Sequence, residues 1–292
     1  MEYRVVGRTR ASLEATFGGD QLAEIVTWNP NDAESARAAV RGSGTVVYLV
    51  GVPYNHFELH PLLMRKAVDA AVSEGVENFL LIGTVYPYGM PQTTPVTEEH
   101  PREPNTFKGR MRKEQEDVLL EADAKARIRG AILRLPDFYG PNVKNSYLHS
   151  LFEAAANGGT ASMLGPIDTP HEFVFVPDVG PVVVDLIAKP AWGRWWNLAG
   201  AGVAPQRELA ERVFAMAGAK PRLRVAGKNM LRILGLFNPL MRELVEMHYL
   251  LTNPVLMDDS ALRNLLGEIR KTPYEDGLRA SLNDSQRRRA LP

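Results

Sequence analysis

Short apolar runs alternate with helix-like segments through the first half of this 292-residue chain. The runs lie at 3–6, 23–27, 45–50, 78–82 and 131–135. The run at 45–50, TVVYLV, is apolar without a break, which is typical of a strand buried on both faces of a sheet. Strands that alternate with helices form βαβ units. The sequence therefore predicts an α/β fold, a parallel sheet with helices on both faces.

The pattern changes after Pro141, and from Gln206 onward the chain is mostly helical. This is typical of a large α/β domain with a smaller C-terminal lobe above the carboxyl ends of the strands, where open parallel sheets bind ligands. We assign residues 1–140 and roughly 178–198 to the α/β domain, and roughly 141–177 and 199–292 to the lobe.

Charge and residue content exclude several classes of protein. The 34 basic and 34 acidic side chains balance, which argues against electrostatic binding of nucleic acid. There is no cysteine for disulfides or thiolate sites, and the 6 histidines lack metal-binding spacing, so we expect no metal. The chain has no run of about 18 apolar residues and no signal-peptide pattern at its start, so we expect a cytoplasmic protein with no membrane partner.

Five segments resemble, in order, motifs of one enzyme family. They are NFLLIGTVYPYG at 78–89, VTEEHPREPNTFKGRMRKEQED at 96–117, AILRLPDFYGP at 131–141, DTPHEFVFVPDV at 168–179 and LLGEIRKTPYEDGLRASL at 265–282. The chain thereby resembles the extended short-chain dehydrogenase/reductase family, NAD-dependent epimerase/dehydratase group, in an atypical subgroup. The resemblance implies a Rossmann-like fold and a nicotinamide dinucleotide that exchanges a hydride with a carbonyl or carbinol carbon of a small molecule.

The first departure from the family lies at the N-terminus. The family opens with a strand and a GxxGxxG turn that holds the cofactor pyrophosphate at a helix N-terminus. Nothing before Tyr3 matches this element, and the chain starts at what resembles the family's second strand. We expect the first βα unit to be missing from a product about 25–30 residues longer. The segment GAGVAP at 200–205 is a weaker alternative, because a junction within the lobe explains it as well.

The second departure lies at the catalytic pair, which in the family is a Tyr and a Lys four residues later. When KGRMR is aligned on its GR, Lys108 takes the place of the Tyr and Arg112 that of the Lys. A shift of one residue puts Phe107 and Met111 there instead. Arg112 would keep a positive charge for the nicotinamide ribose. Lys108 becomes an acid–base group only where its surroundings favour the neutral amine. The alternative is a solvated basic helix start.

Two candidate catalytic residues follow the strand at 78–82. Thr84 matches the family's Ser/Thr that hydrogen-bonds the substrate oxygen, although a turn-capping role is the alternative. Tyr86 lies just beyond it and is a candidate replacement for the proton donor.

Candidate cofactor contacts follow the other predicted strands. Arg8 lies where members of the family contact the adenosine ribose of the cofactor. A basic residue at this place favours the 2′-phosphate of NADP, so we expect NADP rather than NAD. Further positions match family motifs on the adenine side, beside the cofactor, and on the nicotinamide side. They are Asn29 and Asp32, then Val50, Gly51 and Val52, then Pro136 and Phe138.

The resemblance thus implies an NAD(P)-dependent oxidoreductase or epimerase-like enzyme with a small-molecule substrate. The alternative is a non-catalytic dinucleotide-binding or scaffold protein that keeps the fold, which the loss of both Tyr and Lys favours. Members of the family often pair through two helices, so the segments at 59–73 and 107–124 suggest a homodimer.

Overall fold

Four parallel strands form the central sheet, in the order β3-β4-β5-β9. Their bounds are β3 (Thr45–Tyr48), β4 (Asn78–Thr84), β5 (Arg129–Leu135) and β9 (Arg194–Asn197). The computed structural model describes residues 2–290. Met1, at which we expect the chain to be shortened, and residues 291–292 lie outside the described residues.

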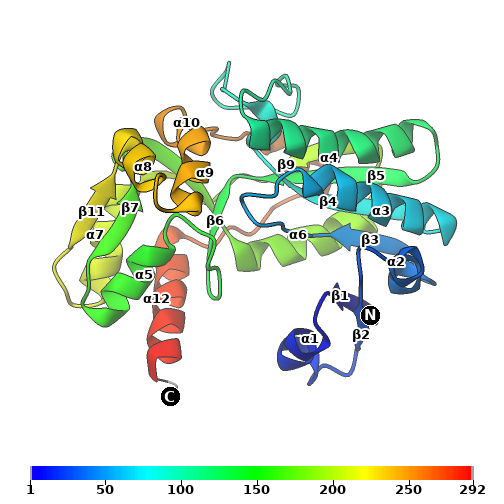
Figure 1. Ribbon diagram of the computed structural model, residues 1–292, viewed down its shortest axis with the longest axis horizontal. Coiled ribbons are helices and arrows are strands. Elements are labelled where there is room, and N and C mark those ends of the chain that lie inside the picture. The colour runs from blue at the N-terminus through cyan, green and yellow to red at the C-terminus, as the bar shows by residue number, and fades with distance from the viewer. Residues whose placement is uncertain (1, 291–292) are drawn as a thin grey trace.

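Helices cover both faces of this sheet, as Figure 1 shows. On one face lie α3 (Leu59–Ser73) and α4 (Phe107–Ala124), and on the other lies α6 (Val176–Ala188). Successive strand residues point to opposite faces, so Phe79 packs into the core beneath α3 and α4, and Leu80 packs into the core beneath α6. The α/β fold with a Rossmann-like parallel sheet is confirmed.

The first two strands stand apart from the central sheet. β1 (Tyr3–Gly7) pairs only with β2 (Ala23–Thr27), in parallel, as a separate two-stranded sheet. α1 (Arg10–Phe17) follows β1, and α2 (Ala33–Val40) follows β2. Figure 1 shows that β1, α1 and β2, the N-terminal unit, project from the rest of the molecule, whereas α2 lies beside β3. Arg4 attaches this unit to α2, because its Nη1 donates a hydrogen bond to the main-chain oxygen of Arg41, the C-cap of α2, at 2.8 Å.

The remaining elements build the C-terminal lobe around a core of its own. They are β6 (Asp137–Tyr139), α5 (His149–Asn157), β7 (Ala161–Leu164), β8 (Pro170–Phe175), β10 (Val203–Pro205), α7 (Gln206–Met216), β11 (Leu223–Ala226), α8 (Lys228–Leu234), α9 (Pro239–Met247), α10 (Tyr249–Thr252), α11 (Ser260–Leu266) and α12 (Tyr274–Ala290). β10, β8 and β6 form one small sheet, and β11 pairs with β7. Leu151, Phe173, Val213 and Leu278 lie fully buried between these elements. The domain boundaries assigned from the sequence stay a prediction.

No helix within residues 2–290 has both the length and the apolar content needed to cross a membrane.

Candidate active site

The carboxyl end of β4 carries two hydroxyl groups. β4 ends at Thr84, and the chain then tightens into the 3-10 turn η1 (Tyr86–Tyr88). The Thr84 hydroxyl accepts a hydrogen bond from the Tyr86 main-chain N–H at 3.4 Å. The Tyr86 hydroxyl lies 2.7 Å from that of Tyr54, which comes from the loop after β3. Two phenols therefore meet where the sequence predicts a substrate oxygen.

Burial governs the acidity of this tyrosine pair. Burial raises the pKa of Tyr86 well above its usual value, and the neighbouring Tyr54 raises it further. Burial also raises the pKa of Tyr54 to about 12, although its bond to Tyr86 acts in the opposite direction. Both phenols are therefore protonated near neutral pH and can donate hydrogen bonds.

The start of α4 is held against η1 by a cap and a glycine. Thr106 Oγ1 accepts from the Gly109 N–H at 3.0 Å, which fixes the first turn of the helix. A Cβ at Gly109 would come within 2.9 Å of the Tyr86 main-chain oxygen and 2.7 Å of the Pro104 Cβ. Only glycine allows this approach, and it places Lys108 and Arg112 beside the tyrosine pair.

Lys108 is enclosed by two carboxylates from the lobe. Its Nζ lies 2.6 Å from Glu243 and 2.8 Å from Glu246, both on α9. Its side chain is only 1% exposed, and Nζ lies 5.5 Å from the centre of the Tyr54 ring. Lys108 therefore connects the start of α4 to α9 of the lobe, and its role in the chemistry stays a prediction.

Arg112 lies one helical turn further on and is also buried. Its Nη1 lies 3.3 Å from His60 Nδ1, and its Nη2 donates to the Ile82 main-chain oxygen at 3.4 Å. Burial lowers the pKa of Arg112. Burial and the nearby guanidinium lower the pKa of His60 to about 3, so the neutral imidazole accepts from Arg112. Arg112 is thus held at the end of β4, where the sequence placed it.

A buried ion pair fixes the rotation of α4. Arg134 of β5 makes two hydrogen bonds with Glu116 of α4, at 2.9 and 2.6 Å, and both side chains are buried. Arg134 also donates to the Tyr88 hydroxyl at 2.8 Å. A bidentate pair of this kind allows little rotation, so it orients the face of α4 that carries Lys108 and Arg112.

Several polar groups near the tyrosine pair were not assigned to the site from the sequence. Burial raises the pKa of Tyr54, Tyr86, Tyr147 and Tyr249, and the nearby Asp137 carboxylate raises each of them further. Asp137 Oδ2 in turn lies 2.6 Å from Nε2 of the buried His171. Tyr54 and Asp137 follow the ends of predicted strands, where polar side chains converge in a parallel sheet, so the sequence offered a way to find them. Tyr249 and the two glutamates of α9 lie in no such position, and no sequence pattern points to them.

The candidate cofactor contacts occupy the carboxyl ends of β1, β2, β3 and β5. Arg8 is exposed after β1. Asn29 and Asp32 follow β2, where Asn29 closes a turn onto the Asn31 N–H and Asp32 caps α2. Gly51, with Val50 and Val52 beside it, follows β3, and a Cβ at Gly51 would meet open space.

The nicotinamide-side candidates follow β5 directly. Pro136 is buried, and Phe138 is half-buried in β6. The exposed Arg8 and the open space at Gly51 leave room for a dinucleotide, and the individual contacts stay a prediction. The structure assigns GAGVAP to the lobe, because Gly200 packs against the Phe173 main-chain oxygen and β10 pairs with β8.

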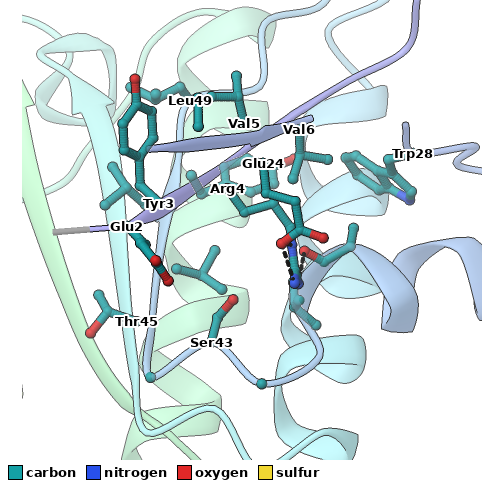
Figure 2. Close-up of a pocket in the computed structure, with 18 of the residues that line it drawn as sticks. Glu2, Tyr3, Arg4, Val5, Val6, Glu24, Trp28, Ser43, Thr45 and Leu49 are labelled. Atoms are coloured by element: carbon teal, nitrogen blue, oxygen red, sulfur yellow. Dashed lines mark hydrogen bonds and ion pairs between the residues drawn. The ribbon is translucent and has the colours of Figure 1, made fainter. Parts of the chain in front are cut away.

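A cavity separates the N-terminal unit from the central sheet. It measures about 1070 Å³ and is lined by β1, β3, Ala67 of α3 and Ile187 of α6. Figure 2 shows Tyr3, Val5, Thr45 and Leu49 around this space. Of the candidate cofactor contacts only Val50 lines it. The cavity therefore lies within the plane of the sheet, away from the site at the strand ends.

Polar residues at the carboxyl ends of a parallel sheet, beneath a helical lobe, define a nucleotide-dependent enzyme of the Rossmann type. The chain belongs to the NAD dependent epimerase/dehydratase family, whose profile matches residues 2–199. This membership confirms the enzyme class expected from the sequence and supports a nicotinamide dinucleotide cofactor.

Solved structures share the fold at low sequence identity. UDP-glucuronic acid 4-epimerase from Bacillus cereus, in complex with NAD, is 15% identical with a TM-score of 0.80, covering 98% of this chain and 90% of that one. The dTDP-glucose 4,6-dehydratase DesIV from Streptomyces venezuelae, as a double mutant with NAD bound, is 18% identical with a TM-score of 0.82, covering 99% and 88%. RMD from Pseudomonas aeruginosa, complexed with NADPH, is 16% identical with a TM-score of 0.76, covering 97% and 100%.

One curated relative is y4nG, an uncharacterized protein of Sinorhizobium fredii. It is 25% identical over 157 residues, which make up 54% of this chain and 39% of that protein. The matched part thus spans less than half the length of this relative.

Proposed function

We propose that the protein is an NAD(P)-dependent oxidoreductase or epimerase-like enzyme acting on a carbonyl or carbinol of a small molecule. The observation that carries this is the pair of Tyr54 and Tyr86 hydroxyls, 2.7 Å apart, above the end of β4. A proton donor at this place is what hydride chemistry on a carbonyl needs, because the oxygen must gain a proton when the carbon gains a hydride.

Each residue of the site has a defined task in this proposal. Thr84 binds the substrate oxygen, and Tyr86 donates a proton to it or takes one back. Tyr54 supplies the second hydroxyl, which holds the Tyr86 hydroxyl in place through their hydrogen bond. Arg112 binds the nicotinamide ribose, and a bound dinucleotide supplies or accepts the hydride. Lys108 positions α9 over these groups through its two glutamates.

NADP is the preferred dinucleotide in this proposal. Arg8 makes no side-chain hydrogen bond or ion pair within residues 2–290, so its guanidinium is available to a 2′-phosphate. The other end of the dinucleotide would lie along the open space above Gly51.

We also propose that a further strand fills the cavity between β1 and β3, as the missing first βα unit would. A five-residue strand occupies roughly 800 Å³, at ~3.3 Å per residue, ~4.8 Å between strands and ~10 Å between layers. The cavity of about 1070 Å³ has room for one. Filling it would also supply a pyrophosphate-binding turn between β1 and β3. An in-frame stop codon directly upstream of Met1, without a strand–glycine pattern, overturns this part.

A non-catalytic dinucleotide-binding protein is the second candidate. The observation in its favour is that Lys108, at the place of the family's Tyr, is enclosed by Glu243 and Glu246. A protein of this kind would bind the dinucleotide and show no turnover.

The experiment that separates the candidates begins with titration of the 292-residue chain by NADPH and NADH, followed by thermal shift and cofactor fluorescence. Turnover is then measured with a panel of carbonyl compounds and with UDP-glucuronic acid and dTDP-glucose, substrates suggested by the structural relatives. Tyr86→Phe should lower turnover about 10²-fold or more with little change in cofactor affinity. Tyr3→Phe, at the far edge of the molecule, is the matched control.

Binding without turnover on the whole panel supports the second candidate. Unchanged turnover in Tyr86→Phe removes Tyr86 from the mechanism. Absence of binding, restored when the upstream residues are added, supports the strand proposal and leaves the enzyme assignment in place.

A further inference from the structure

The helical hairpin formed by α8 and α9 exposes an unusual amount of apolar surface. The loop between the helices carries Leu236 and Phe237, which are 78% and 86% exposed. These are the two most exposed large apolar side chains in the described part of the chain. The other exposed apolar residues of the hairpin are Met230, Ile233, Leu234 and Leu240.

The α8–α9 hairpin packs against the lobe on one side and presents an apolar face to solvent on another. Met230, Ile233 and Leu234 follow a spacing of three and four residues, so they share one face of α8. Leu231, on an adjacent face of α8, is fully buried and anchors the helix in the lobe. At Gly235 a Cβ would lie 2.9 Å from the Arg242 main chain, so glycine lets the two helices meet closely.

The exposed charged side chains around the apolar tip are basic. Lys228, Arg232 and Arg242 are exposed on α8 and α9. The only acidic residues between 221 and 247 are Glu243 and Glu246, and Lys108 already neutralises part of their charge. Apolar side chains flanked by basic ones are typical of a segment that lies in the interface of an anionic membrane.

We propose that the α8–α9 hairpin binds the surface of a bilayer containing anionic lipid, with Leu236 and Phe237 inserted among the acyl chains and Lys228, Arg232 and Arg242 at the headgroups. This departs from the expectation, drawn from the sequence, that the protein has no membrane partner. A second copy of the chain is a poorer occupant, because a symmetric contact would bring two identical basic patches together. The proposal does not depend on the proposed catalytic function.

The test is sedimentation of the full chain with vesicles of phosphatidylcholine alone or with about one third phosphatidylserine. We expect binding to the anionic vesicles, weaker binding without phosphatidylserine, and loss of the electrostatic part at about 0.5 M salt. The double variant Leu236→Ser/Phe237→Ser should reduce binding at least about tenfold. The matched control is Leu62→Ser/Val184→Ser, which removes two exposed apolar side chains from α3 and α6 and should bind normally.

Circular dichroism and thermal melting of each variant verify the fold, and light scattering gives the oligomeric state. Failure of the unaltered chain to sediment with anionic vesicles at low salt overturns the proposal. Equal vesicle binding by the hairpin variant and the control variant also overturns the proposal. A dimer that the hairpin variant converts to a monomer, without vesicle binding, would assign this surface to contact between copies instead.

Discussion

The Lys108 ammonium lies 2.6 Å from the Glu243 carboxylate and joins the start of α4 to α9 of the lobe. The residue that aligns with a catalytic tyrosine is therefore a polar connection between α4 and the lobe at the site. Glu246 adds two contacts, accepting from Nζ at 2.8 Å and from the Lys108 main-chain N–H at 3.2 Å. The contribution of this connection to the free energy of unfolding can be measured.

Lys108→Met should lower the free energy of unfolding by about 2 kcal/mol, because it leaves two carboxylates without their partner. The figure lies below that of a fully buried pair, since the two glutamates are 23% and 31% exposed. Urea unfolding measures it. Adding Glu243→Gln and Glu246→Gln should recover part of the loss. Lys113→Met, which breaks the exposed pair with Asp117, should cost less than about 0.5 kcal/mol, and equal losses in both would contradict the prediction.

His60 should make the stability fall in acid. Its folded-state pKa of about 3 lies below the unfolded value of 6.5, so between these values the unfolded state binds more protons. Its contribution is complete above pH 6.5 and is lost progressively toward pH 3, by about 2 kcal/mol at pH 5. His60→Asn keeps an acceptor for Arg112 and should lose less stability between pH 7.5 and 5. The exposed His56→Asn should retain the full dependence, and identical pH profiles for all three proteins would refute this role.

Gly109→Ala should destabilise the protein by about 1–3 kcal/mol, since its Cβ meets the Tyr86 oxygen at 2.9 Å. Relief of this contact pushes α4 away from η1, so turnover or cofactor binding should fall as well. Gly19→Ala is the control, because a Cβ there meets nothing within 4 Å and should change stability by less than about 1 kcal/mol. Thermal melting of both variants checks the difference. A neutral Gly109→Ala would mean that the helix start is less constrained than the contacts indicate.

Main-chain amides that face the cavity between β1 and β3 should exchange their hydrogens with solvent faster than amides that face a neighbouring strand. The Tyr3 N–H donates to Leu22 and the Asn78 N–H to Gly44, and along a parallel strand successive amides face alternate neighbours. The amides of Arg4, Val6, Thr45 and Val47 therefore face the cavity. They should exchange with solvent faster than those of Val5, Val46 and Tyr48. Residue-resolved hydrogen exchange by NMR measures this, and uniform protection along both strands would show that the gap closes in solution.

The periodic first half of the fold was predictable because its signals are local. The bounds of α3 and α4 agree with the segments at 59–73 and 107–124, and the sequence places β2 at 23–27 as observed. β6, β7, β10 and β11 have only three or four residues each, too few to show a period. α12 was not predicted because its exposed residues are strongly polar and a glycine interrupts it. That glycine, Gly277, is explained by the Tyr139 hydroxyl, which occupies the space of a Cβ.

The site residues could be predicted from the sequence only where they lie in segments that resemble family motifs in the family's order. Thr84, Tyr86, Lys108 and Arg112 do gather at the end of β4, and their chemical roles stay a proposal. The glutamates around Lys108 lie 135 and 138 residues away in the chain, so no local pattern could link them. Their contacts with Lys108 favour the positioning role that we propose for it, and that role stays a proposal.

The position of these glutamates has a consequence for the hairpin. Glu243 and Glu246 belong to α9, the second helix of the hairpin, so α9 cannot lift from α4 without separating an ammonium from two carboxylates. Because the Lys108 side chain is only 1% exposed, dissolved ions screen this contact much less than an ion pair at the surface. The base of the hairpin therefore stays attached to α4 by charge even at an ionic strength that weakens surface pairs.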